Sequence, residues 1–148
     1  MATWEKIEDI EIWKETRSLC NKIWDLIQNT SLKNDFKLRD QMSGSSGSIM
    51  DNIAEGFGRE GNKEFKQFLS YSIGSCSELR SQLYRCLDRK YIDENTFNIL
   101  NNDVLIITKR IKTLMNYLKE SPYKGQKFKE PLENYFSTID DKSNRLEP

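Results

Sequence analysis

The sequence contains no histidine among its 148 residues. This absence excludes Ser-His-Asp and Cys-His nucleophile systems, imidazole metal ligands and the Glu-x-x-His motifs of di-iron helical bundles. Aspartate, glutamate, lysine and cysteine remain, but no nucleotide-binding glycine motif or paired-acid arrangement organises them. We therefore expect a protein that is not an enzyme and that holds no metal or cofactor.

Cysteine and proline are scarce as well. The cysteines are odd in number and include no CxxC pair, which argues against a disulfide framework and against a zinc site: Cys20, Cys76 and Cys86. We expect them to be small core residues in a reducing compartment. The prolines all follow Ser121, so residues 1–120 lack the residue that most strongly interrupts helices: Pro122, Pro131 and Pro148.

Long apolar runs are absent too. No window approaches the roughly 18 consecutive apolar residues of a membrane span. The N-terminus, MATWEKIEDIEIW, is acidic where a signal peptide would be basic and then apolar. We expect a soluble, cytoplasmic protein with one domain at residues 1–120. Residues 121–148, which hold the prolines and show no periodic seam, are predicted to be extended or disordered.

What the sequence has instead is apolar residues at helical spacing. The clearest seam advances by three and four residues from Phe97 to Leu118, and Asp93 is a plausible N-cap in front of it. Similar seams run from Phe65 to Cys86 and, near the start, from Ile12 to Leu26. The spacing predicts helices at about 9–29, 35–57, 62–89 and 93–119. Short connections favour antiparallel neighbours, hence an all-α, up-down-up-down four-helix bundle.

The stretch MSGSSGSIMDNIAEGFGREGNKEF, residues 42–65, begins like a linker but continues with helical periodicity. Gly44 and Gly47 would each cost roughly 1 kcal/mol relative to alanine inside a helix, so they need a reason. Close approach of another backbone is the usual one, and we interpret the small-residue run as a contact surface within a helix. Gly74 receives the same interpretation. The glycines at 56, 58 and 61 are expected to end one helix and lead into the next.

A polar stripe accompanies this helix, with steps of four, three and four residues: Ser48, Asn52, Glu55 and Arg59. One interpretation is a solvated face with a Glu-to-Arg pair that contributes only about 0.3 to 0.5 kcal/mol. The other is a partly buried network of Asn52, Glu55 and Arg59 that fixes the helix end against a neighbouring helix or subunit. The residues by themselves favour the first interpretation.

The segments SIMDNIAEGFGR and KEFKQFLSYSIGSCSELRSQL resemble a known family over about residues 10–118. It comprises the bacterial four-helix bundle proteins encoded within intervening sequences of 23S ribosomal RNA genes, and a related protein assists reverse transcription in diversity-generating retroelements. The resemblance implies a homopentamer, favours the buried network, and marks a set of motif and oligomer-contact residues: Ser48, Asn52, Glu55, Gly56, Arg59, Gly74 and Glu78.

Charge is balanced, with 23 basic and 23 acidic residues. One group of basic residues could form a phosphate-binding surface: Arg80, Arg85, Arg89, Lys109, Arg110 and Lys112. The alternative is that these residues only solvate helix faces. We therefore expect a homo-oligomeric scaffold whose further partner is RNA or a nucleic-acid enzyme, or else a protein-binding adaptor without a nucleic-acid role.

Overall fold

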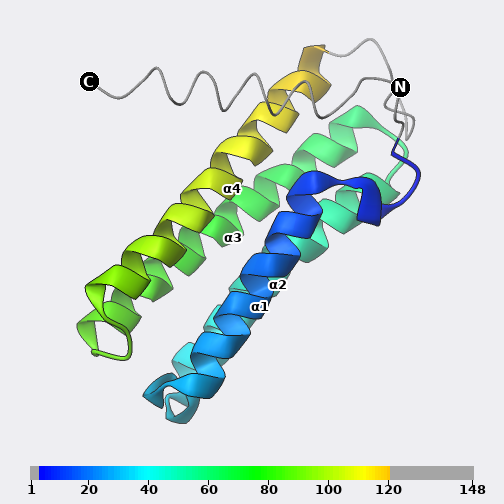
Figure 1. Cartoon of the computed structure of the whole chain (residues 1–148). Coiled ribbons are helices and arrows are strands. Elements are labelled where there is room, and N and C mark those ends of the chain that lie inside the picture. Colours follow the sequence, from blue (N-terminus) through cyan, green and yellow to red (C-terminus); the bar gives the residue numbers. More distant parts are fainter. Residues whose placement is uncertain (1–3, 121–148) are drawn as a thin grey trace, which may run out of the picture.

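The structure, a computed structural model, describes residues 4–120, and these form four long helices (Figure 1). The helices are α1 (Glu11–Asn29), α2 (Phe36–Gly58), α3 (Asn62–Asp88) and α4 (Glu94–Glu120), with short 3-10 turns η1 (Ile7–Asp9) and η2 (Ser31–Asn34). This part of the chain contains no strand. The prediction of an all-α protein with four helices is confirmed.

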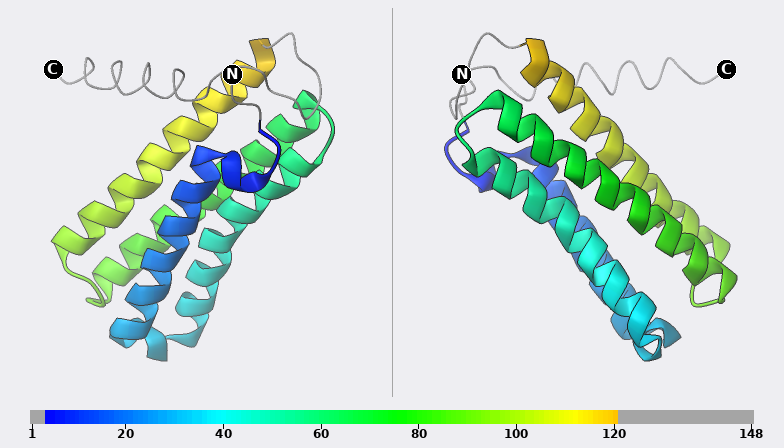
Figure 2. Two further views of the ribbon diagram at one scale, coloured as in Figure 1. Left: turned by 45° about the vertical axis from the view of Figure 1, so that its right-hand side comes forward. Right: turned by 180° about the vertical axis from the view of Figure 1, so that it is seen from behind.

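Consecutive helices run antiparallel, so the chain goes up and down the bundle twice (Figure 2). Helix α1 packs against α2 and α4, and α3 packs against the same two helices. The start of α1 and the end of α4 therefore lie at the same end of the bundle (Figure 1). None of the helices between residues 4 and 120 is both long and apolar enough to cross a bilayer.

Aspartate side chains fix the starts of two helices. Asp35 Oδ1 accepts a hydrogen bond from Leu38 N at 3.4 Å, and Asp93 Oδ1 accepts one from Thr96 N at 2.7 Å. The first helix starts later than the predicted residue 9. There the Asp9 carboxylate accepts bonds from the backbone N–H groups of Glu5 and Lys6, at 3.0 and 3.1 Å, which closes η1 as a separate turn. The extended backbone of Ile10 then separates η1 from α1.

The core follows the predicted seams. Every residue of the 97–118 seam and every residue of the 65–86 seam is buried, as is the seam of α1 from Ile12 to Leu26. Trp24, also on α1, lies outside these seams and is 57% exposed. The predicted tail, residues 121–148, lies outside the described residues.

An aromatic cluster covers one end of the bundle. Trp4 is only 3% exposed, and its ring centroid lies 6.3 Å from that of Phe57 and 6.4 Å from that of Phe65. Phe57 and Phe65 are themselves in edge-on contact, with centroids 6.2 Å apart. The residues before α1 are thereby held against the turn between α2 and α3.

Candidate functional site

The small-residue run of α2 is helical, not a hinge. Ser45 and Ser46 are buried, and Ser46 Oγ donates to the Met42 carbonyl oxygen at 2.9 Å, so the Ser46 hydroxyl is satisfied within the helix. A Cβ atom added at Gly44 or Gly47 would meet no atom of another element within 4 Å. The close backbone approach that we expected at these glycines is therefore not made within the described chain. It stays a prediction about a partner.

Beside these small residues lies a trough between α1 and α2 with a volume of about 280 Å³. None of the residues that line it is charged: Cys20, Ile23, Trp24, Ile27, Ser43, Ser46, Gly47 and Met50. The Cys20 thiol donates to the Ser46 carbonyl oxygen at 3.2 Å, and burial raises its pKa, so the thiol stays protonated and joins the two helices. We call this feature, with the exposed Trp24 at its edge, the α1–α2 trough.

Polar residues of the 48–59 stripe bind α2 to α3. Ser75 Oγ donates to Ser48 Oγ at 2.9 Å, while Asn52 Nδ2 donates to the same oxygen at 3.0 Å and to the Ser48 carbonyl at 2.8 Å. One turn earlier, Ser45 Oγ donates to Glu78 Oε2 at 3.4 Å. The motif residues Ser48 and Glu78 therefore connect α2 and α3 within one chain, while Asn52 holds the Ser48 side chain from within α2.

The predicted network of Asn52, Glu55 and Arg59 does not form within the described chain. Asn52 bonds to Ser48 instead, whereas Arg59 Nη2 pairs with Glu55 Oε1 at 2.7 Å one turn away. The side chains of Arg59 and Glu55 are 54% and 52% exposed, and the guanidinium also lies 5.2 Å from the centroid of the Phe68 ring. The geometry is that of a solvated i, i+4 pair, the interpretation that the residues alone had favoured.

Gly56 has a different role from the one predicted. It lies inside α2 and is buried, and an added Cβ would come 2.8 Å from Phe68 Cβ and 3.1 Å from Phe65 Cδ1. The helix ends two residues later, at Gly58. Gly56 therefore allows α3 to approach α2, the role we had assigned to Gly74. At Gly74, which is exposed, an added Cβ would have no neighbour within 4 Å. The spacing of Gly56 from Ile49 and Ile53, on the buried face, was the missed signal.

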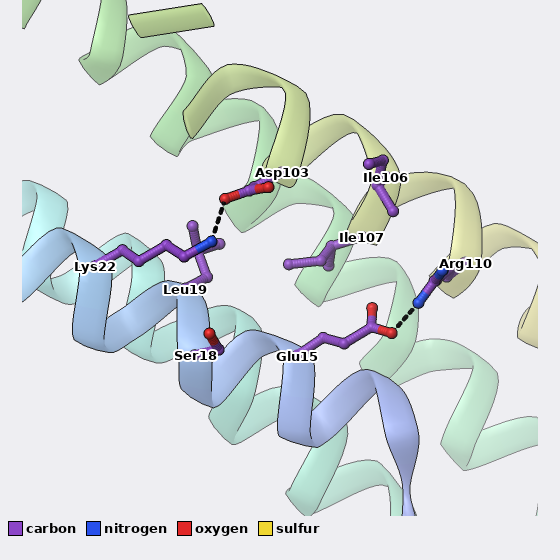
Figure 3. A pocket seen from close by; sticks show the side chains of 8 residues that line it. All are labelled: Glu15, Ser18, Leu19, Lys22, Asp103, Ile106, Ile107 and Arg110. Atoms are coloured by element: carbon purple, nitrogen blue, oxygen red, sulfur yellow. Dashed lines mark hydrogen bonds and ion pairs between the residues drawn. The ribbon is translucent and has the colours of Figure 1, made fainter. Parts of the chain in front are cut away.

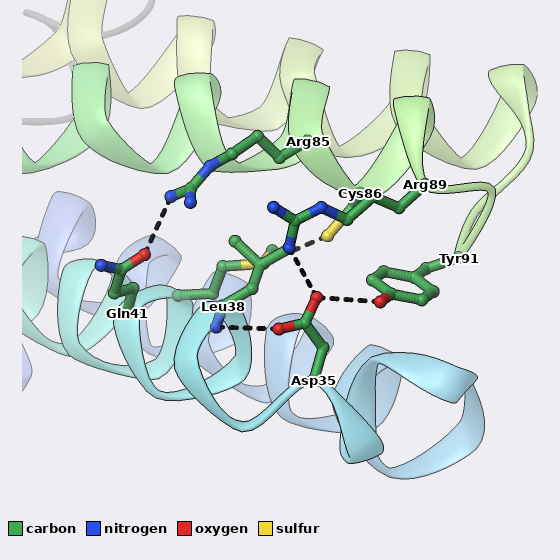
Figure 4. Close-up of polar contacts among 8 residues, drawn as sticks. Asp35, Leu38, Gln41, Arg85, Cys86, Arg89 and Tyr91 are labelled. Atoms are coloured by element: carbon green, nitrogen blue, oxygen red, sulfur yellow. Dashed lines mark hydrogen bonds and ion pairs between the residues drawn. The ribbon is translucent and has the colours of Figure 1, made fainter.

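The six basic residues do not form one surface. Arg80 Nε donates to Asn101 on α4 at 2.9 Å, whereas Arg85 donates to Gln41 on α2 at 2.9 Å (Figure 4). On α4, Arg110 is paired with Glu15 of α1. Residues two apart on a helix do not share a face, so Lys112 points away from Arg110. Lys109 and Lys112 are exposed.

Arg89 belongs to a cluster that joins the start of α2 to the end of α3 (Figure 4). Asp35 Oδ2 accepts hydrogen bonds from Arg89 Nη1 at 2.6 Å and from the Tyr91 hydroxyl at 2.8 Å. The bond from Tyr91, followed by the bonds from Arg89 and Leu38 N, holds the pKa of Asp35 below its ordinary value of 3.8. Burial raises the pKa of the nearby Cys86 thiol to about 11. These bonds hold the start of α2 against the end of α3, and Arg89 is paired with Asp35.

The contact between α1 and α4 is hollowed along its length. Two ion pairs bridge it, Lys22 with Asp103 at 2.8 Å and Glu15 with Arg110 (Figure 3). Around them lie two hollows of about 200 and 510 Å³, and Lys22 lines both. Among residues 4–120, no three His, Cys, Asp or Glu side chains gather as a metal site.

The sequence and the fold were compared with those of known proteins. A protein from Bacteroides thetaiotaomicron VPI-5482, described as of unknown function and from the S23 ribosomal protein family, has a similar fold with a TM-score of 0.64. The two sequences are 21% identical, and the match covers 70% of this chain and 97% of the other. No curated protein matches. The family model of the 23S rRNA-intervening sequence protein matches residues 8–113. The chain therefore belongs to the family of 23S rRNA-intervening sequence proteins.

Proposed function

We propose that this chain is a non-enzymatic scaffold that assembles into a homopentamer in the cytoplasm and acts together with RNA or a nucleic-acid enzyme. The observation that carries the proposal is the α1–α2 trough. A tryptophan that is 57% exposed stands at the edge of an uncharged hollow, next to glycines with open space around them.

Such a surface is suited to another protein surface. Covering the exposed part of Trp24 would contribute on the order of 2 to 3 kcal/mol per subunit, from a large aromatic side chain at about 25 cal/mol per Å². Gly47 and Ser43 would let a second helix come close, because they add no bulk beside the trough. The lining holds no charge whose desolvation would oppose association.

The nucleic-acid part of the proposal rests on the family's name and on two exposed lysines. Lys109 and Lys112 lie one turn apart on α4, away from the pair of Arg110 with Glu15. Assembly would repeat these lysines once per subunit, so a weak phosphate contact would become multivalent. The chain has no net charge, which is the observation that favours the alternative, a protein-binding adaptor without a nucleic-acid role.

A pair of matched variants tests the assembly. Trp24→Lys places a charge at the edge of the trough. The control, Ile99→Lys, places a charge on the α1–α4 side of the bundle, at a residue of similar exposure, 53%. Sedimentation velocity should show that Trp24→Lys lowers the sedimentation coefficient toward that of a single chain while Ile99→Lys keeps the wild-type value. Circular dichroism should show both variants folded. Equal sedimentation of wild type and Trp24→Lys would remove the trough as the assembly surface.

Fluorescence anisotropy of a labelled, structured RNA distinguishes the RNA-associated scaffold from the protein-binding adaptor. Binding should be tight only at low salt, and Lys109→Glu with Lys112→Glu should weaken it by at least about tenfold. The control exchanges Lys33 and Lys37, which are also exposed, for glutamate. Negligible binding by all three proteins at low salt would favour the adaptor.

A further inference from the structure

The groove between α1 and α4 has an unpartnered apolar edge. Ile99 and Ile106 are 53% and 40% exposed, although isoleucine is among the residues most often fully buried. They are seven residues apart, which is two helical turns, and so lie on the same side of α4, with one hollow beside each. An apolar occupant with the same two-turn spacing would fit this edge.

The chain continues from the C-terminal end of α4, which lies beyond the end of the groove marked by Glu15 and Arg110. Glu120 is the last residue of α4, ten residues beyond Arg110, or about 15 Å along the helix axis. The seven residues 121–127 can span up to about 23 Å when extended. A segment that begins near residue 128 can therefore reach the end of the groove marked by Glu15 and Arg110.

The sequence that follows has the spacing that the groove requires. In KFKEPLENYFSTI, apolar residues recur at steps of four, three and four: Phe128, Leu132, Tyr135 and Ile139. A helix with Pro131 in its first turn, where proline is tolerated, would carry Leu132, Tyr135 and Ile139 on one face, with Phe128 just before it. Leu132 and Ile139 are seven residues apart, the same separation as Ile99 and Ile106. The prediction that residues 121–148 are extended or disordered was based on their composition and did not take this stripe into account.

Charge favours the same placement. Three lysines lie around the start of the stripe, Lys124, Lys127 and Lys129. At the end of the bundle where they would enter the groove, the chain around the start of α1 carries Glu8, Glu11 and Glu15. Glu8 is exposed, and the Glu11 side chain is 48% exposed. Glu15 pairs with Arg110, so the exposed Glu8 and the half-exposed Glu11, which also pairs with Lys14, offer negative charge to the entering lysines.

We propose that segment 128–139 of this chain occupies the groove between α1 and α4, with Leu132 and Ile139 against Ile99 and Ile106. In this arrangement the chain's own segment, and not a second copy, covers Ile99 and Ile106. The proposal concerns a different face from the α1–α2 trough, so the two can succeed or fail independently.

The test is photo-cross-linking in the full-length chain. A benzophenone amino acid at position 106 should give an intramolecular product, at the mass of a single chain, whose peptide map joins α4 to residues 128–139. The control carries the same group at position 24, on the α1–α2 side, and should give no product with this segment. Leu132→Ser combined with Ile139→Ser should reduce the position-106 product by about tenfold or more, while Leu146→Ser, a tail leucine outside the stripe, should leave it unchanged.

Three results would overturn the proposal. One is a position-106 product of twice the chain mass, which would mean that a second copy covers the groove. Another is equal capture of the segment from positions 24 and 106, which would mean non-specific contact. The third is a yield that the Leu132 and Ile139 substitutions do not change. Methyl NMR of Ile99 and Ile106 gives an independent readout, because their shifts should move in the Leu132→Ser, Ile139→Ser variant and not in Leu146→Ser.

Discussion

Lys22 Nζ lies 2.8 Å from Asp103 Oδ2, and a second pair repeats this relationship two turns away with the charges exchanged, Glu15 on α1 with Arg110 on α4. Glu15 and Lys22 are seven residues apart on α1, and Asp103 and Arg110 are seven residues apart on α4. The earlier residue of α1 pairs with the later residue of α4, as antiparallel packing requires. Sliding one helix by two turns would bring Lys22 to Arg110 or Glu15 to Asp103. The alternating polarity therefore favours one register of α1 against α4.

Exchanging one pair of charges tests this relationship. Lys22→Glu should lower the free energy of unfolding by up to about 1 kcal/mol, because it places two acids together at a site that is only partly exposed. Combining it with Asp103→Lys should restore most of the loss, as measured by urea unfolding. Additive losses in the double variant would show that the pair is not coupled.

The Asp35 cluster should make stability depend on pH. Because the folded-state pKa of Asp35 is lowered, its contribution is present above the ordinary value of 3.8 and is lost as pH falls through the lower folded value. Asp35→Asn should therefore unfold at lower urea than wild type near neutral pH, since it loses the charged acceptor for Arg89 and Tyr91. Well below pH 3.8 the two proteins should converge, because Asp35 is then protonated in both states of the wild type.

A matched aspartate gives the control for this pH profile. Asp40 is close in sequence and is paired with Arg39, but its side chain is 71% exposed. Asp40→Asn should follow the wild-type unfolding midpoint at every pH. A constant difference between Asp35→Asn and wild type down to the lowest pH would show that the loss is one of packing and not of charge.

Gly56 and Gly44 should respond in opposite directions to the same substitution. Gly56→Ala puts a methyl group 2.8 Å from Phe68 Cβ and should cost about 1 to 3 kcal/mol in thermal or urea unfolding. Gly44→Ala meets no neighbour and should gain up to about 1 kcal/mol from the higher helix propensity of alanine. Destabilisation of similar size at both positions would contradict the packing described for α2.

The Glu55–Arg59 pair should contribute little in a single chain. Arg59→Ala and Glu55→Gln should each change the free energy of unfolding by less than about 0.5 kcal/mol, since both side chains are about half exposed. Unfolding measured at low protein concentration reports on the separate chain. A loss of roughly 3 to 5 kcal/mol for Arg59→Ala, recovered in the double variant, would instead indicate the buried network that the family resemblance implied.

Local patterns in the sequence predicted most of the fold. The seam from Phe97 to Leu118 and the capping residues Asp35 and Asp93 act within a few residues of chain, so spacing alone identifies them. Trp4 could not be placed in this way. Its burial against Phe57 and Phe65 depends on a contact across more than fifty residues, which no local period records.

The candidate site was less predictable for the same physical reason. Whether an arginine is available depends on the neighbouring helices, and Arg85 and Arg89 face acceptors on α2 that lie more than forty residues away. Gly56 looked like part of a turn because Gly58 and Gly61 follow it; its spacing from Ile49 and Ile53 places it on the buried face, and the position of Phe68 shows what packs there. The exposure of Trp24 likewise depends on what packs beside α1, which no local spacing records.

The most direct test of the scaffold is the mass of the wild-type protein in solution. If the α1–α2 trough is covered by another copy, size-exclusion chromatography with multi-angle light scattering should give about five times the chain mass of 17.5 kDa at micromolar concentration. A single monodisperse species at the mass of one chain would contradict the account.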